Sequence, residues 1–141
     1  MERPERKDIA LAFGLVGVLT AVVLVIFGDT RDLDYTWPGQ IGVVIIAGPS
    51  AWLAGYAFGG MFGHPRAMGW VFACVGACLS TVLGAAIGGT FVLPLLGTII
   101  APAVLFEQAI ANPMIGIIWL AAMAGLHVFV LKSVSCSADG K

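Results

Sequence analysis

Two histidines are the side chains whose positions first suggest chemistry. His127 lies inside a long apolar run near the C-terminus, and His64 lies in a short polar loop. Ionisable residues within membrane segments often mark functional sites, and two histidines can supply both axial ligands of a haem. The alternative is that His127 makes an interhelical hydrogen bond and His64 lies at the membrane interface. We favour this alternative because His64 precedes Pro65 in a loop, which would hold an axial ligand poorly.

Glu107 is the second candidate for intramembrane chemistry. It is the only acidic residue between Asp34 and Asp139, and it follows an apolar stretch that contains prolines. A single buried carboxylate could carry a proton or a cation across a membrane. If the chain transports a solute, we expect Glu107 and His127 to be the residues involved. Otherwise we expect Glu107 to lie at the interface, facing headgroups or water.

The remaining reactive residue types do not form a recognisable catalytic or metal-binding set. Cys74 and Cys78 are one helical turn apart, but no histidine or acid lies near them to complete a metal shell. We expect both to be buried packing residues. The chain lacks the short motifs of serine hydrolases, zinc proteases and P-loop enzymes. We therefore expect no catalytic residue, no metal and, haem aside, no cofactor.

The composition explains why so few residues are available for chemistry. Hydrophobic residues make up 60% of the chain, charged residues only 11%, and the mean hydropathy is +1.00. A soluble domain carries about a quarter charged residues. The net charge of -1 with no basic stripe excludes nucleic acid as a partner. We expect an all-α integral membrane protein, because unpaired backbone amides are costly in lipid, with residues 1–141 forming a single membrane domain.

Four apolar segments are long enough to cross a bilayer. They cover residues 9–28, 40–62, 68–90 and 113–131. The stretch 91–111 is ambiguous because it contains Pro94 and Pro102, and its apolar part falls short of the roughly 17 residues that a span requires. It is either a re-entrant segment or a short fifth helix. We expect the polar tail beyond Lys132 to be frayed.

The distribution of lysine and arginine discriminates between four and five spans. Cytoplasmic loops carry the excess of these residues. If residues 91–111 return to the side that they left, six of the seven Lys and Arg residues lie on the side of the N-terminus. If the stretch crosses, the balance is almost even. We therefore predict four spans with both termini cytoplasmic, in a bacterial inner membrane, and keep five spans as the alternative.

Small residues recur at every fourth position on two of the predicted spans. Such residues let two helix backbones approach closely in lipid, where burial alone does not drive association. One interpretation is packing within the bundle, and the other is a surface for another protein or a second copy. Ala121 and Gly125 repeat the spacing more weakly on the last span. The predicted helix-packing interface comprises Gly55, Gly59, Gly63, Gly76, Ser80, Gly84 and Gly88.

These features together favour a non-catalytic polytopic membrane protein. Our leading hypothesis is a small accessory or assembly subunit that packs against other membrane protein subunits or against itself. A second hypothesis is a small oligomeric transporter or channel that uses Glu107 and His127. A third is a haem-binding electron-transfer subunit of the membrane.

Overall fold

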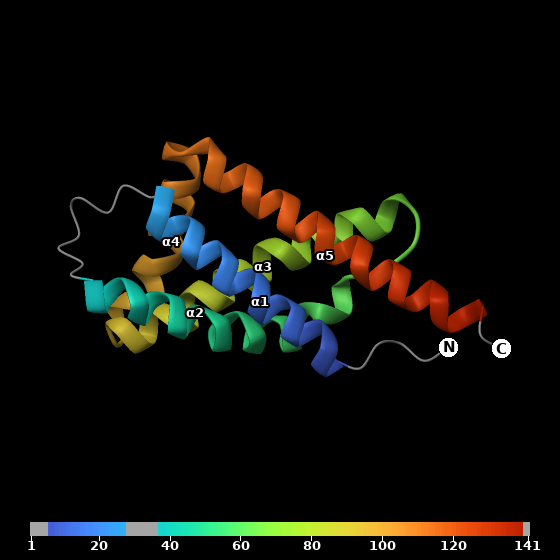
Figure 1. Cartoon of the computed structure of the whole chain (residues 1–141), viewed down its shortest axis with the longest axis horizontal. Coiled ribbons are helices and arrows are strands. Elements are labelled where there is room, and N and C mark those ends of the chain that lie inside the picture. The colour runs from blue at the N-terminus through green and yellow to red at the C-terminus, as the bar shows by residue number, and fades with distance from the viewer. Residues whose placement is uncertain (1–5, 28–36, 140–141) are drawn as a thin grey trace.

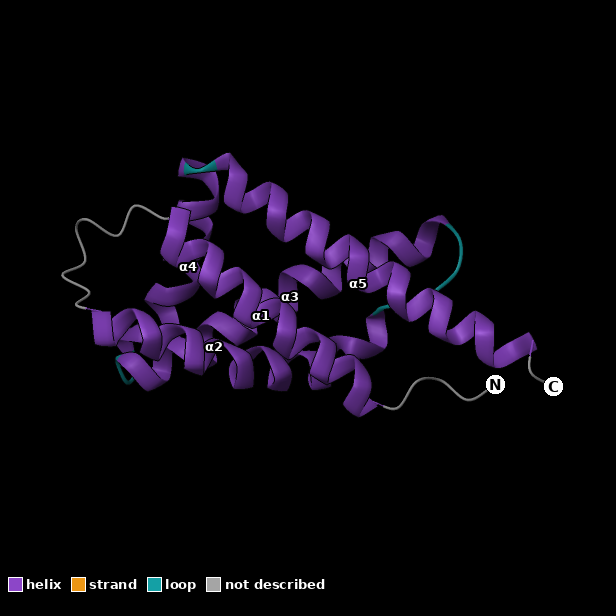
Figure 2. Ribbon diagram, viewed as in Figure 1, coloured by secondary structure: helices purple, strands orange, loops and turns teal. Residues whose placement is uncertain are grey.

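In a computed structural model that describes residues 6–27 and 37–139, the chain forms helices, and short turns connect the helices of the second range (Figure 2). No β-strand occurs within these two ranges. The predicted all-α fold class is therefore confirmed. The elements are α1 (Arg6–Phe27), α2 (Trp37–Phe58), the 3₁₀ helix η1 (Gly59–Met61), α3 (Ala67–Val92), α4 (Leu96–Ala111) and α5 (Pro113–Asp139).

Four of the helices are long and apolar enough to cross a membrane. These are α1, α2, α3 and α5, whereas α4 is a shorter apolar helix. The chain is thus a multi-pass membrane protein, as predicted. The expectation of a frayed tail is wrong, because α5 continues past Lys132 to Asp139. Ser, Cys and Ala do not break a helix, and the first strong breaker after Lys132 is Gly140.

The four long helices run alternately up and down the bundle (Figure 1). The helix α1 begins and α5 ends at one end of the molecule, which we call the terminal end. The opposite end, which we call the loop end, holds the end of α3, the whole of α4 and the start of α5. The segment after α3 therefore stays at the loop end, and the bundle contains four helices long enough to cross a membrane plus one shorter apolar helix.

A tight turn between α3 and α4 reverses the chain at the loop end. Pro94 lies in this turn, and the next residue, Leu95, has a φ of 69°. The turn brings the backbones of Gly89 and Gly97 so close that a Cβ on either would overlap the carbonyl oxygen of the other. Both positions therefore require glycine.

The far end of α4 is fastened by a single asparagine. The side-chain Nδ2 of Asn112 donates a hydrogen bond of 2.7 Å to the carbonyl oxygen of Phe27, the last residue of α1. The Oδ1 of Asn112 accepts a hydrogen bond of 3.2 Å from the backbone N–H of Met114, in the first turn of α5. One side chain thus caps α5 and ties the α4–α5 junction to α1.

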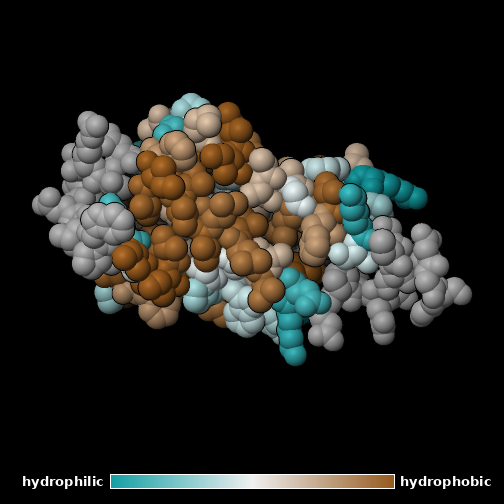
Figure 3. Space-filling view, in the orientation of Figure 1, coloured by the Kyte–Doolittle hydropathy of each residue, from teal (hydrophilic) through white to brown (hydrophobic). Residues whose placement is uncertain are grey.

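The best-packed apolar core lies near the terminal end. Phe13 of α1 and Phe62, which follows η1, meet edge to face with ring centroids 5.0 Å apart. Leu126 and Val130 of α5 close this cluster from the other side. Elsewhere large apolar side chains cover the surface, as expected of a protein that is solvated by lipid. Figure 3 shows apolar residues over the middle of one face, with hydrophilic residues toward the terminal end.

Candidate functional site

The small residues of α2 face α1. A Cβ added at Gly55 would collide with the Phe13 side chain, and one added at Gly59 would lie 2.8 Å from the Ile9 side chain. Four residues farther along the chain, Gly63 has a φ of +79° and lies against Val130 of α5. These glycines therefore let α1, and locally α5, approach the backbone of α2 and η1.

The small residues of α3 face α2 and η1. A Cβ added at Gly76 would lie 2.9 Å from the side chain of Phe62. A Cβ added at Gly84 would lie 3.7 Å from Ala51, and one added at Gly88 would lie 3.5 Å from Ser50. Ser80 is buried, and its hydroxyl donates a hydrogen bond of 3.0 Å to the carbonyl oxygen of Ala77. The structure thus places the six glycines of the predicted interface against neighbouring elements of the same chain, and the hydrogen bond of Ser80 lies within its own helix.

Cys74 and Cys78 do not share this environment. Both thiols are exposed on the outer surface of α3, so the expectation that they are buried packing residues is wrong. At about 100° per residue they lie on the opposite side of the helix from Gly76 and Ser80. The sequence spacing placed them on one face but did not reveal which face is turned toward α2.

One pair of small residues remains without a neighbour in this chain. Ala121 and Gly125 are exposed on α5, and an added Cβ at Gly125 would meet nothing within 4 Å. Ile117, Leu120 and Phe129, each more than half exposed, flank the pair. We call Ala121 and Gly125 with these three flanking residues the α5 stripe. It is an exposed apolar surface with small residues at its centre.

His127 lies in the core near the terminal end. Its side chain is 1% exposed, and its Nδ1 accepts a long hydrogen bond of 3.4 Å from the backbone N–H of Gly63. The ring of Trp70 lies 4.6 Å from the imidazole, centroid to centroid. The Nε2 of His127 has no hydrogen-bond partner. The imidazole thus joins α5 to the turn after η1 rather than to another helix.

His64 follows Gly63 directly, so the two histidines lie at the same end of the bundle. The Nδ1 of His64 is also buried without a hydrogen-bond partner. The described residues contain no group of three or more His, Cys, Asp or Glu side chains able to hold a metal ion. Two imidazoles would suffice only for a cofactor that supplies its other ligands itself, as haem does. Haem binding therefore stays a prediction.

Glu107 and His127, the two polar candidates for transport, are not brought together. Glu107 is exposed on α4 at the loop end, whereas His127 is buried near the terminal end. Neither side chain lines either of the two cavities described below. A mechanism that used both would need a path along most of the length of the bundle.

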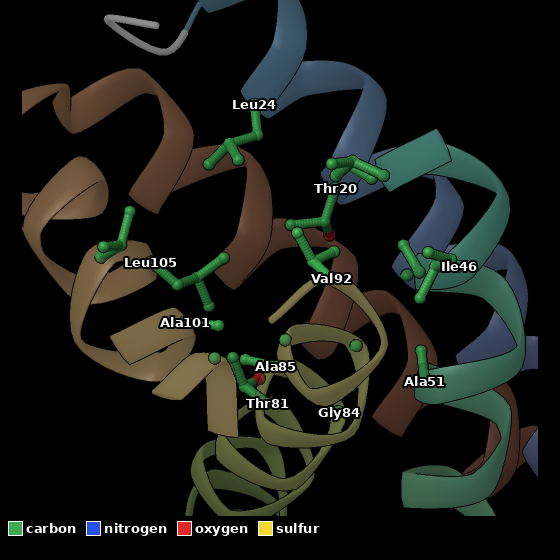
Figure 4. Close-up of a pocket in the computed structure, with 18 of the residues that line it drawn as sticks. Thr20, Leu24, Ile46, Ala51, Thr81, Gly84, Ala85, Val92, Ala101 and Leu105 are labelled. Atoms are coloured by element: carbon green, nitrogen blue, oxygen red, sulfur yellow. The ribbon is translucent and has the colours of Figure 1, made fainter. Parts of the chain in front are cut away.

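All five α-helices border a large apolar cavity, which the sequence did not predict. It has a volume of about 340 Å³. Figure 4 shows its walls, with Thr20 and Leu24 on α1, Ile46 and Ala51 on α2, several small residues of α3, and Ala101 and Leu105 on α4. Trp119 and Met123 of α5 complete the lining.

The hydroxyl groups around this cavity are occupied by neighbours within the chain. Thr20 donates a hydrogen bond of 2.8 Å to the carbonyl oxygen of Val16, and Ser80 donates to Ala77. The Oγ1 of Thr81 accepts a bond of 3.1 Å from the indole N–H of Trp119. A cavity with so few free polar groups is not a favourable place for water.

The hydrogen bond between Trp119 and Thr81 also borders a second cavity. This smaller space has a volume of about 150 Å³ and shares Thr20, Thr81, Leu105 and Trp119 with the first. Both spaces are partly open at the surface of the bundle, so molecules of the surrounding medium can enter them.

Sequence reasoning missed the cavity because no local pattern encodes the space between nonadjacent helices. Thr81 and Trp119 carried the only available signal, since a tryptophan inside an apolar span needs an acceptor for its indole N–H.

Comparison with known proteins finds no matching family model, no similar curated protein and no similar solved structure.

Proposed function

We propose that this chain is a non-catalytic polytopic membrane protein that acts by packing against other membrane helices. It would serve as a small accessory or assembly subunit of a larger complex, or associate with copies of itself. The observation that carries the proposal is the α5 stripe. Gly125 presents bare backbone to the membrane with nothing within 4 Å, and close backbone approach is what small residues provide in helix association.

The contrast with α2 and α3 supports this assignment. In those helices and η1, the glycines of the predicted packing interface at positions 55, 59, 76, 84 and 88 contact α1, α2 or η1 of the same chain, so these positions are not free for a partner. The helix α5 packs mainly on α1 and has few contacts with α3. Its outward surface is therefore the natural place for another helix to dock.

The polar residues support a non-catalytic role. Among the described residues, the buried polar side chains are Ser50, Ser80 and His127, and they come from three different helices. Ser50 lies near Gly88 and its hydroxyl has no partner, while Ser80 bonds within its own helix. Among these three buried side chains no nucleophile is paired with a base, which is what covalent catalysis requires.

The charges support an orientation with both termini in the cytoplasm of a bacterial cell, in the inner membrane. Arg6, Lys7, Arg66 and Lys132 belong to helix ends and turns at the terminal end of the bundle. The cytoplasmic side of membrane proteins carries the excess of such residues. The loop end would then face the periplasm.

A direct test is the Gly125→Leu variant. The leucine side chain would fill the α5 stripe and push a partner helix away, while the monomer has room for it. We expect association, measured by cross-linking in native membranes and by co-purification in mild detergent, to fall about tenfold, which corresponds to about 1.4 kcal/mol.

Gly42→Leu is the matched control, because Gly42 on α2 also has nothing within 4 Å but lies outside the α5 stripe. It should leave association unchanged. If the Gly125→Leu variant kept its native partners, or if both variants lost them equally, the α5 stripe would not be the interface.

A small oligomeric transporter or channel is the second candidate function. The observation in its favour is that α4, which contains Pro102, borders the large cavity. Transporters often place discontinuous helices beside a substrate cavity, and α4 shares the position beside the cavity although it is continuous from Leu96 to Ala111. The positions of Glu107 and His127 at opposite ends weigh against a single site that uses both.

A further inference from the structure

The large cavity has an opening toward the surrounding membrane. The helix α4 contributes Gly97, Ile100, Ala101, Val104 and Leu105 to the lining, and α1 and α2 form the opposite wall. Yet α4 has few contacts with either α1 or α2 among the described residues. The two walls therefore border the same space without sealing it, and Figure 4 shows them facing one another across it.

We propose that this cavity binds the hydrocarbon chain of a membrane lipid, which enters between α2 and α4. The proposal does not depend on the α5 stripe or on the function assigned to it. The lining is almost entirely apolar, and the hydroxyls of Thr20, Ser80 and Thr81 are engaged within the chain. In a bilayer core the molecule available to fill such a space is an acyl chain rather than water.

The polar groups of the lining also indicate which way the lipid would lie. Gln40, in the first turns of α2, contributes an amide to the lining at the loop end. It is the second residue of the candidate span Gly39–Met61, so it lies at the level of the lipid headgroups. The headgroup would therefore remain near Gln40, while the chain extends past Thr20 toward Trp119.

Trp119 offers an internal reporter of the occupant. Its indole lines both cavities and is held in place by Thr81. Bromine atoms on a lipid acyl chain quench tryptophan fluorescence only when the two are nearly in contact. Replacing Trp37, Trp52 and Trp70 by phenylalanine would leave Trp119 as the single emitter.

The experiment reconstitutes this single-tryptophan protein in phosphatidylcholine vesicles with and without brominated chains. We expect strong quenching of Trp119 in the brominated vesicles. Ala85→Phe should remove most of the quenching, because Ala85 lines the cavity on α3 (Figure 4) and a phenyl ring would occupy the space. Ala57→Phe is the matched control, since Ala57 is exposed on α2 and does not line the cavity.

A second variant guards against misfolding of the first. The Val92→Phe substitution, at the last residue of α3, places a phenyl ring in the same cavity. Native mass spectrometry after delipidation should detect one retained phospholipid in the parent protein and none in this variant. Trp119 that is not quenched would overturn the proposal. Equal quenching in the cavity-filling variants and in Ala57→Phe would also overturn it, because the quencher would then be bulk lipid at the outer surface.

Discussion

The two halves of this bundle, α1 to α3 and α3 to α5, differ in what their small residues contact. Between α1, α2 and α3, glycines face a neighbouring helix whose side chains lie against the bare backbone, as Phe13 does at Gly55. Between α3 and α4, the backbones of Gly89 and Gly97 meet near the turn, but Ala85, one helical turn before Gly89, lines a cavity. Small residues therefore produce tight packing only where a second helix reaches them.

The largest effect is expected at the turn between α3 and α4, where the two halves join. Gly97→Ala would place a methyl group on the carbonyl oxygen of Gly89. Neither atom belongs to a flexible side chain, so the backbone itself must move. We expect a loss of more than about 3 kcal/mol in the free energy of unfolding, above the usual range for overpacking. The measurement is reversible unfolding by sodium dodecyl sulfate in mixed micelles.

Gly42→Ala is the control for this loss, because an added Cβ there meets nothing within 4 Å. It should leave stability unchanged or slightly improved, since alanine favours helix. If the Gly97→Ala protein were as stable as the control, the backbones of α3 and α4 would have to lie farther apart at Gly89 than in the structure.

An intermediate effect is expected within the tightly packed half, where the glycines that recur at every fourth position are not equivalent. Gly55→Ala would push against the Cβ and ring of Phe13, whereas Gly84→Ala would meet Ala51 and Ala54 at 3.7 Å. We expect the first to cost about 1–3 kcal/mol and the second to cost less than about 1 kcal/mol, because it gains ordinary contacts. Equal losses of unfolding free energy in the same assay would mean that these glycines affect stability through helix propensity rather than through packing.

The sequence predicted most of the fold because hydrophobicity and span length are local properties. The uncharged runs that contain Phe13 and Gly84 could only be membrane helices, and Pro94 marked the break before α4. The lysine and arginine balance favoured four spans, since Lys132 had to share a side with Arg6. The error at the end of α5 arose because polar character was read as fraying, although no helix breaker precedes Gly140.

The candidate sites were harder to predict because they depend on how helices are rotated about their axes. Every fourth position defines a face, but it does not say what the face meets, which is why Cys74 was wrongly expected to be buried. Gly125 is exposed, and a cavity lies beside Thr81, because α4 and α5 are not packed against another helix at these places. The hydrogen bond between Asn112 and Phe27 joins residues far apart in the chain, and no periodicity encodes it.

The most direct test of this account is the side of the membrane on which single cysteines are labelled. After replacement of Cys74, Cys78 and Cys136 by alanine, Arg6→Cys, Glu107→Cys and Lys132→Cys, all at exposed positions, would be probed with a maleimide that does not cross the bilayer. In the four-span bundle, positions 6 and 132 should react from one side of the membrane and position 107 from the other. Reaction of position 132 from the side opposite to position 6 would mean that the 91–111 stretch crosses the membrane, which would contradict the four-span bundle.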